Sequence, residues 1–444
     1  MFDTILRGGQ IVGVDGLTTV DVAIKDGRIA ALLKPGHPAE AGAVLDCAGR
    51  LLFPGLVDAH VHLREPGLTQ KEDFVSGTRA AAAGGVTTLL VMPTDQPWTE
   101  TPEQLAGKIA ASRGRLHVDA AFQVAISKRT VDLKALRDTG AISFEIFTAD
   151  VPDEFRHDSL HELLAALRRC HGLGPLTCIS PGDQSLLAAT ERSGGSDFVA
   201  FANSRPPLAE ASGIARAILA AADTGARVHI RQSNAGLGMA VLRRLKDMAD
   251  VSIETTPQNL LFTQQDYAKG GAAIKASPPF RQATDVAGLR RAVRDGLIDI
   301  VCTDHAPHTP AEKAASYPRF TDIPGGMPGV QTLLPVMLHL ASAGAFDLPD
   351  IVRLCSANPA RRFGLAGRKG LIEAGGDADI VVVDPTRSST IENADQHSKA
   401  CTTPFAGFRL PYRLERTLLR GRTVAIGQSV EAEPTGEVVI AASA

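Results

Sequence analysis

The sequence has no long hydrophobic run, no paired-cysteine motif and no strong net charge. No apolar run approaches the ~18 residues that a membrane-spanning helix needs, and the N-terminus, Met1-Phe2-Asp3-Thr4, has no secretory pattern. Six scattered cysteines without a C-x-x-C favour reduced thiols over a disulfide framework. The formal net charge of −3 gives no electrostatic reason to expect nucleic acid or an anionic membrane as a partner. These absences leave a small-molecule substrate open and make the cytoplasm the default location.

The two ends of the chain share one pattern. Residues 1 to 52 contain short strand-like runs separated by turn signals, which suggests antiparallel β structure. The same pattern recurs at 378–384 and 418–424. We therefore predict one small β-sandwich domain built from residues 1–52 and 368–444.

Residues 53–367 follow a different pattern, in which apolar strand-like runs alternate with amphipathic helices rich in alanine and leucine. Strands expected at 86–91, 228–230 and 298–302 each follow a helix expected at 75–83, 214–222 and 286–295. Repeated strand–helix units imply a parallel sheet and favour a (β/α)8 TIM barrel, which takes ~250 residues. A doubly wound open sheet is the alternative, weakened because no glycine-rich phosphate fingerprint follows a strand.

An H-x-H motif stands at the end of the first apolar run of this region. Because side chains alternate faces along a strand, His60 and His62 point the same way and can close on one metal ion. A bare H-x-H can also be a pair of hydrogen-bonded surface histidines. The buried character of 51–57, with the histidines where the strand would run out into a loop, favours a metal site.

A second polar segment, Thr303-Asp304-His305-Ala306-Pro307-His308, follows another apolar run. Since the carboxyl ends of barrel strands converge on one mouth, Asp304 is expected to lie beside the H-x-H. Two histidines and an aspartate offer an ion neutral nitrogens and one anionic oxygen. An open coordination position would lower the pKa of a bound water, whose proton Asp304 could accept as the catalytic base. Taken alone, Asp304 could equally be a turn or cap carboxylate.

Several segments together resemble the amidohydrolase superfamily. They are Val57-Asp58-Ala59-His60-Val61-His62-Leu63-Arg64-Glu65-Pro66-Gly67, Gly84-Gly85-Val86-Thr87-Thr88, the 303–308 segment and Asn358-Pro359-Ala360. Within that superfamily the chain is similar to dihydroorotases, hydantoinases and allantoinases, and Arg64-Glu65-Pro66-Gly67 most resembles dihydroorotase. The resemblance covers nearly the whole chain. It implies a metal-dependent enzyme that opens a cyclic amide with activated water, and a homo-oligomer, either a dimer or a tetramer.

The metal-ligand set departs from the pattern of most relatives. Where they carry a carboxylated lysine that bridges two metals, this chain has Glu145, whose carboxylate can replace it chemically. The two histidines that hold the second metal correspond to Ile179 and Gln232, an isoleucine and a weakly ligating amide. The resemblance therefore implies one divalent metal, held by His60, His62, Glu145 and Asp304. This mix of nitrogen and oxygen ligands favours Zn²⁺, with Fe²⁺ or Mn²⁺ as alternatives.

The substrate side of the resemblance is mixed. Arg64 and His308 match residues that read a substrate carboxylate in dihydroorotases, and a guanidinium can hold a carboxylate with two hydrogen bonds. Thr94 and Ser277 stand at two further substrate-binding positions where dihydroorotases have asparagine. A carboxylate-bearing cyclic amide or ureide is expected, and dihydroorotate itself is less strongly supported.

A non-catalytic protein of the same fold is the alternative from a different functional class. Such relatives lose metal ligands and act as assembly partners, for example of aspartate transcarbamoylase, and Ile179 and Gln232 motivate this hypothesis. The retention of His60, His62, Arg64, Asp304 and His308 together favours the enzyme.

Overall fold

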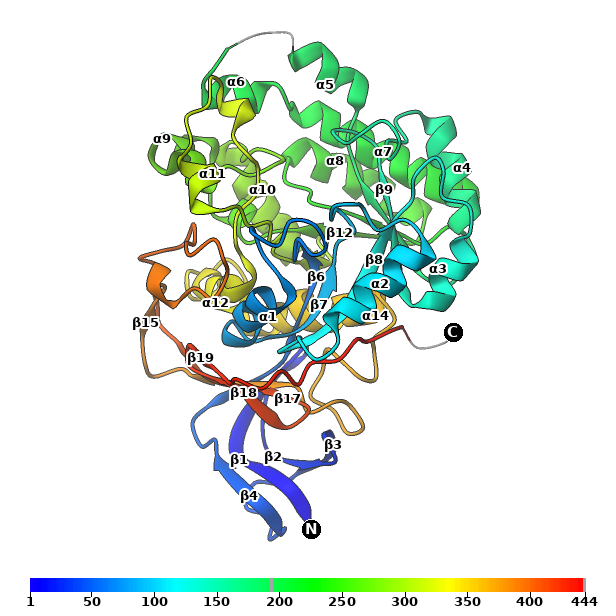
Figure 1. Ribbon diagram of the computed structural model, residues 1–444. Helices are drawn as coiled ribbons and strands as arrows, with labels where there is room; N and C mark the ends of the chain where they lie inside the picture. The colour runs from blue at the N-terminus through cyan, green and yellow to red at the C-terminus, as the bar shows by residue number, and fades with distance from the viewer. Residues whose placement is uncertain (192–194, 442–444) are drawn as a thin grey trace.

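A parallel barrel forms the upper part of the molecule in the computed structural model, which describes residues 1–191 and 195–441 (Figure 1). Neighbouring strands run in the order β13-β12-β11-β10-β9-β8-β7-β6 and pair in parallel. A parallel bridge between Val61 and His305 closes the seam between the first and the last strand. The predicted TIM barrel is confirmed. Its strands are β6 (Leu56–Val61), β7 (Val86–Val91), β8 (Asp119–Ala125), β9 (Ala141–Phe147), β10 (Leu176–Ser180), β11 (Val228–Ile230), β12 (Val251–Thr255) and β13 (Ile300–Val301).

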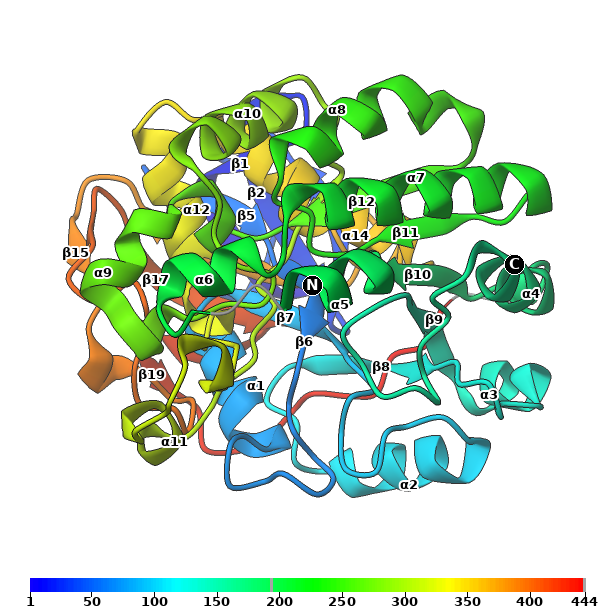
Figure 2. The ribbon, with the colours of Figure 1, turned by 90° about the horizontal axis from the view of Figure 1, so that it is seen from above.

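Helices lie around the outside of these strands, as the view from above shows (Figure 2). Several begin at a capping box, in which two side chains at the helix start each accept a hydrogen bond from the other residue's backbone N–H, as at Asp73 and Ser76 before α1. Within the described ranges, no helix is both long and apolar enough to cross a membrane. The longer helices are α1 (Phe74–Ala83), α2 (Pro102–Ser112), α3 (Leu133–Thr139), α4 (Leu160–Cys170), α5 (Gln184–Glu191), α7 (Pro207–Thr224), α8 (Gly236–Leu245), α10 (Ala283–Arg294) and α12 (Leu333–Ser342). The shorter ones are α6 (Phe198–Asn203), α9 (Tyr267–Gly270), α11 (Pro310–Ala314), α13 (Leu348–Val352) and α14 (Asn358–Arg362).

Both chain ends contribute to a second sheet below the barrel, as predicted (Figure 1). Its nine strands are hydrogen-bonded in the order β19-β18-β17-β14-β5-β1-β2-β3, with β4 beside β1. The sheet is mixed rather than purely antiparallel, because β4 and β5 both pair with β1 in parallel. The strands are β1 (Phe2–Gly13), β2 (Gly16–Lys25), β3 (Arg28–Leu33), β4 (Ala41–Asp46), β5 (Leu51–Pro54), β14 (Ile380–Asp384), β17 (Arg413–Leu419), β18 (Arg422–Ile426) and β19 (Ser429–Val430). A separate ribbon pairs β15 (Ser389–Thr390) with β16 (Arg409–Leu410).

The apolar run that leads to the H-x-H is divided between the two sheets. Strand β5 pairs with β1 and β14 in the sheet of the chain ends, whereas β6 pairs with β7 in the barrel. Gly55 separates them, and a Cβ there would overlap the side chain of Thr87. The chain can therefore pass from one sheet to the other only with glycine at this point. His60 lies inside β6, not in the loop after it.

Candidate metal centre and substrate cavity

The closure of the barrel brings the two motifs of the sequence together. Asp58, which is buried in β6, accepts hydrogen bonds from the backbone N–H of Thr303 at 3.0 Å and from its hydroxyl at 2.5 Å. Four residues after Asp58, the backbone N–H of His62 donates to the carbonyl of His305 at 2.8 Å. Burial raises the pKa of Asp58 to about 6, although the bonds from Thr303 oppose that shift. These contacts hold the segment that carries Asp304 against the strand that carries the H-x-H.

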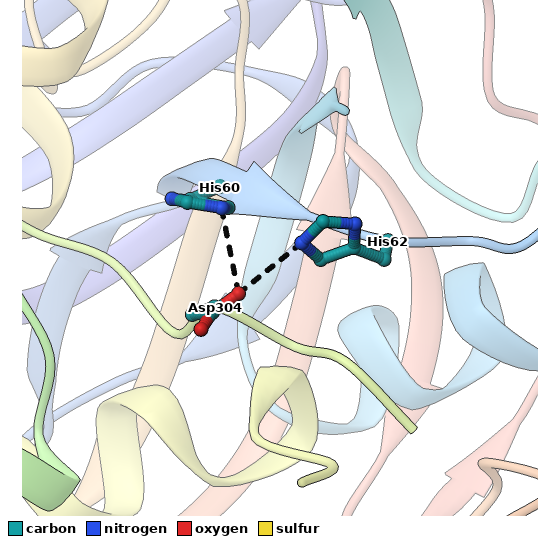
Figure 3. A group of neighbouring side chains, drawn as sticks. All are labelled: His60, His62 and Asp304. Carbon is teal, nitrogen blue, oxygen red and sulfur yellow. Dashed lines mark hydrogen bonds and ion pairs between the residues drawn. The ribbon is translucent and has the colours of Figure 1, made fainter. Parts of the chain in front are cut away.

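Three side chains converge at this seam (Figure 3). The Nε2 atoms of His60 and His62 lie 3.4 Å and 3.2 Å from Oδ1 of Asp304. Their potential ligand atoms all lie within 4.8 Å of one another. Two imidazole nitrogens and a carboxylate are the donor types of a catalytic zinc site that keeps an open position. The residues present therefore fit one divalent ion.

The other ring nitrogen of each histidine is held by a second residue. Nδ1 of His60 lies 2.6 Å from Glu254, and Nδ1 of His62 lies 2.8 Å from the hydroxyl of Thr94. A carboxylate can only accept, so His60 carries its proton on Nδ1 and presents the Nε2 lone pair to Asp304. Burial alone would lower the pKa of His60, but Asp304 and Glu254 outweigh it and raise that pKa. Burial and the charge of Arg64 lower the pKa of His62 to about 3.

The structure does not bring Glu145 to this group. Both of its oxygens accept from the guanidinium of Arg231, at 2.6 Å and 3.2 Å, and both side chains are fully buried. Arg231 also donates to Glu254 at 2.9 Å. Glu145 lies two residues before the end of β9, deeper in the barrel than the mouth, which explains why it meets this arginine instead of the histidines. The geometry thus leaves three of the four predicted ligands together.

The two positions predicted to have lost metal-binding histidines differ in what they contact. Ile179 packs in the outer core among helix residues such as Leu167 and Ile214, while its neighbour Ser180 lines the cavity. Ser180 rather than Ile179 is therefore the residue on the cavity side of β10. Gln232 does lie at the centre, where its amide nitrogen hydrogen-bonds Asp304.

A cavity of about 200 Å³ opens beside the three ligand candidates. Arg64 and Ser277, both predicted to bind substrate, line it. Nε of Arg64 is buried and has no hydrogen-bond partner among the described residues. A second cavity of about 200 Å³ adjoins the first and shares Phe147, Ser180, Gln232 and Ser277 with it. The combined space suits a small ring with a substituent.

Three of the seven described non-glycine residues with positive φ lie at the cavity beside the ligand candidates. Arg64, Gln232 and Asp304 all have positive φ, at 59°, 46° and 48°. A non-glycine residue in this region costs roughly 1–3 kcal/mol and persists only where its surroundings impose it, most often at functional sites. The three strained residues all line the cavity.

The other two predicted substrate residues lie behind the cavity wall. Thr94 faces His62, as described above, and His308 donates from Nε2 to the carbonyl of Gly325 at 3.0 Å. Burial, with the charges of Arg64 and Lys71, lowers the pKa of His308 to about 4. In this structure His308 therefore supports the wall that contains Gly325. His305, expected to be a neighbour and not a ligand, faces Glu72 at 3.2 Å.

The relationship to known proteins agrees with this geometry. Residues 51–424 match the model of the amidohydrolase family. The chain belongs to that family. It is 37% identical to an allantoinase from Rubrobacter xylanophilus, covering 99% of this chain and 97% of the relative. It is 31% identical to a dihydroorotase from Methanosarcina mazei, covering 98% of this chain and 96% of the relative.

Solved structures give the same result. An L-hydantoinase (dihydropyrimidinase) from Arthrobacter aurescens superimposes with a TM-score of 0.95 and 28% identity, covering 99% of this chain and all of that one (100%). The predicted family and its branch are confirmed. The particular weight given to dihydroorotase is not, because the allantoinase shows the higher identity.

Proposed function

We propose that this protein hydrolyses a cyclic amide or ureide that carries a carboxylate, using one divalent metal bound by His60, His62 and Asp304. One observation carries the proposal: the convergent Nε2 atoms and the Asp304 carboxylate lie in the same cavity as Arg64. The nitrogen and oxygen donors favour Zn²⁺. The names of the relatives, allantoinase, dihydroorotase and hydantoinase, support a cyclic amide or ureide as the substrate class.

The reaction divides into roles for this chain's own residues. A divalent ion in the centre supplies Lewis acidity and a nucleophilic water at neutral pH. Asp304 accepts the proton of the attacking water on its carboxylate and returns it to the ring nitrogen as the C–N bond breaks. Gln232 and the two histidines fix the orientation of that carboxylate. The strained backbone at Asp304 aims it into the cavity before the substrate arrives.

Arg64 is the residue that we propose binds the substrate carboxylate. Its guanidinium makes no ion pair with the described acidic side chains, and a bound carboxylate would supply the missing acceptor for Nε. Lys71 and Lys313 also act on His308 from this side of the mouth, although Glu312 pairs with Lys71 at 2.8 Å and burial lowers the pKa of Lys313 to about 7. An anionic ring is therefore favoured over a neutral one.

The experiment that tests the proposal compares ring substrates that differ only in a carboxylate. Purified protein, with its metal content measured, is assayed with dihydroorotate and with dihydrouracil, and in parallel with allantoin and 5-substituted hydantoins. We expect one equivalent of metal per chain and a higher kcat/KM for the carboxylate-bearing member of a pair. Hydrolysis of no cyclic amide by metal-replete protein would overturn the proposal.

The variant Arg64→Met sharpens the same comparison. Loss of a charge-assisted contact of this kind costs about 2–5 kcal/mol, so kcat/KM for the carboxylate substrate should fall by about 30-fold or more, and that for the neutral ring far less. Arg129→Met is the matched control, because the side chain of Arg129 is 69% exposed and does not line the cavity. Equal losses on both substrates would contradict the role of Arg64.

The non-catalytic assembly partner remains the second candidate, because the cavity side of β10 carries Ser180 and a glutamine stands at 232. It predicts no turnover and co-purification with a partner such as a transcarbamoylase. The same protein preparation separates the two hypotheses. The proposed homo-oligomeric state, dimer or tetramer, can be measured by sedimentation on that sample.

A further inference from the structure

The guanidinium of Arg231 lies fully buried in the middle of the barrel, directly behind the proposed metal centre. Glu254 connects the two, since one of its oxygens binds His60 at 2.6 Å and the other binds Arg231 at 2.9 Å. Arg231 is the residue before Gln232, which contacts Asp304. A single arginine is thus joined to the metal-ligand candidates both through a shared carboxylate and through the chain.

All five N–H donors of this guanidinium are matched by oxygen acceptors. They lie 2.5–3.2 Å from the nitrogens and surround them. An arginine has five donors in a fixed plane and cannot be deprotonated inside a protein. The acceptors are the carbonyl of Ala59, Oε1 of Gln123, both oxygens of Glu145 and Oε2 of Glu254.

The charges of this region do not balance without a further cation. Glu145 and Glu254 bind the guanidinium of Arg231, and Asp304 lies at the histidines with the guanidinium of Arg64 in the same cavity. Three carboxylates and two guanidiniums leave one excess negative charge. His229 adds none, because burial lowers its pKa and Ser252 holds its Nδ1 at 2.8 Å. One divalent ion at His60, His62 and Asp304 turns this excess into one positive charge, which a substrate carboxylate at Arg64 would neutralise. A second divalent ion would leave two uncompensated positive charges in a buried site even with that carboxylate bound, which is strongly unfavourable.

We propose that Arg231 is an internal cation that takes the place of a second metal ion and so restricts this centre to one. The inference rests on the proposed single-metal function, and it assigns the restriction to one residue. Its oxygen acceptors would become available if the guanidinium were removed. A site formed by carboxylate, amide and carbonyl oxygens suits a hard cation such as Mn²⁺ better than Zn²⁺.

The test is a titration with Mn²⁺ alone on metal-free full-length protein, with bound metal per chain and thermal unfolding as readouts. Wild type should saturate at one equivalent. Arg231→Ala removes the cation and leaves both glutamates, so it should take up a second equivalent, with a further rise in Tm between one and two equivalents. If the variant folds poorly, Mn²⁺ should restore its folding yield, because the ion returns the lost charge.

Two further variants separate charge from simple damage. The double variant Arg231→Ala with Glu145→Gln has the same net charge as wild type and should saturate at one equivalent again. Arg227→Ala removes an exposed arginine of the same segment, paired with Asp250 at 3.2 Å, and should behave as wild type.

The inference is overturned if Arg231→Ala neither binds a second equivalent nor is recovered by Mn²⁺, or if the double variant binds two. Wild type that binds two would also overturn it, while hydrolysis of cyclic amides could persist. Wild type that binds none would remove the proposed function itself, so the two failures are distinguishable.

Discussion

Two clusters of buried charge occupy opposite ends of the barrel strands, and they differ in balance. The lower cluster joins the barrel to the sheet of the chain ends: Lys369 lies 2.6 Å from Asp119 at the start of β8 and 2.7 Å from Asp379 beside β14. Arg420 binds Asp119, and Arg368 binds Asp377, which Lys369 also contacts at 3.1 Å. Three carboxylates there meet three cations. The upper cluster has three carboxylates, Glu145, Glu254 and Asp304, but only two arginines, Arg231 and Arg64.

The difference shows that burial of charge does not by itself mark a functional site. In the lower cluster each charged group has a partner of opposite sign, and no cavity described above is lined by Lys369 or Asp119. The upper cluster combines an excess of negative charge with an open cavity and backbone strain at Arg64, Gln232 and Asp304. Positive φ does not separate the two clusters, since Arg420 of the lower cluster has φ of 45°. The excess negative charge and the open cavity are what distinguish the functional site.

The largest effect should come from removing the reacting carboxylate of the upper cluster. Asp304→Asn keeps the size of the side chain but removes the negative charge and the proton acceptor, so kcat/KM should fall by about 10³-fold or more. The fold should persist, because Asp304 pairs only with groups at the cavity. Ring-opening kinetics followed by absorbance, with circular dichroism and metal content on the same sample, measure this. Activity within tenfold of wild type would exclude Asp304 as the base.

The lower cluster should respond in stability and not in activity. Lys369→Met leaves three buried carboxylates short of one cation, which costs about 3–5 kcal/mol of unfolding free energy. Urea denaturation measures the loss, and activity per folded chain should be unchanged. Lys134→Met is the control, since Lys134 is 71% exposed in its pair with Asp138 and should shift stability by less than about 1 kcal/mol. A change in kcat for Lys369→Met would argue against two independent clusters.

A smaller effect should follow from the residue that orients His62. Thr94→Val removes the hydroxyl that faces Nδ1 but keeps the shape of the side chain, so metal affinity should fall by about 10–100-fold. Competition with a chelator measures the affinity. Thr139→Val is the matched control, because that hydroxyl only bonds to the carbonyl of Ala135 in its own helix. An unchanged affinity for Thr94→Val would show that Glu254 alone organises the centre.

The sequence predicted the parts of the upper cluster that follow from strand geometry. His60 and His62 share a face because alternation is a local property of a strand, and Asp304 meets them because all strand ends of a barrel converge. The parallel order of the barrel followed from its repeated strand–helix units, and the pairing of the chain ends followed from the short strand-like runs that both ends share. These features need no knowledge of which side chains actually touch.

How deep a side chain lies within the barrel could not be predicted from the same sequence patterns. Glu145 is in a position where the family implies a ligand, yet its contacts depend on Arg231, which comes 86 residues later. Glu254 was missed as well. A signal existed, because Glu254 and Asp58 are acidic residues inside fully buried strands, and such groups must find partners. Identifying those partners requires the register between neighbouring strands.

The smallest expected effect comes from a charge pair that belongs to neither cluster. Glu312 lies at the rim of the mouth, 2.8 Å from Lys71 and 30% exposed, and it caps α11 by accepting from the N–H of Thr309 at 2.9 Å. Burial opposes ionisation of Glu312, but Lys71 and Thr309 outweigh it and lower its pKa to about 2. A carboxyl whose folded pKa lies below its unfolded value of 4.5 stabilises the folded protein at pH values above 4.5, and this stabilisation is lost as the pH falls toward 2.

Glu312→Gln retains a capping group and should cost less than about 1 kcal/mol of unfolding free energy at pH 6.5, because solvent screens an exposed pair. The difference between wild type and variant in urea denaturation should shrink at pH 3, and a difference that stays constant with pH would assign the loss to packing instead of charge.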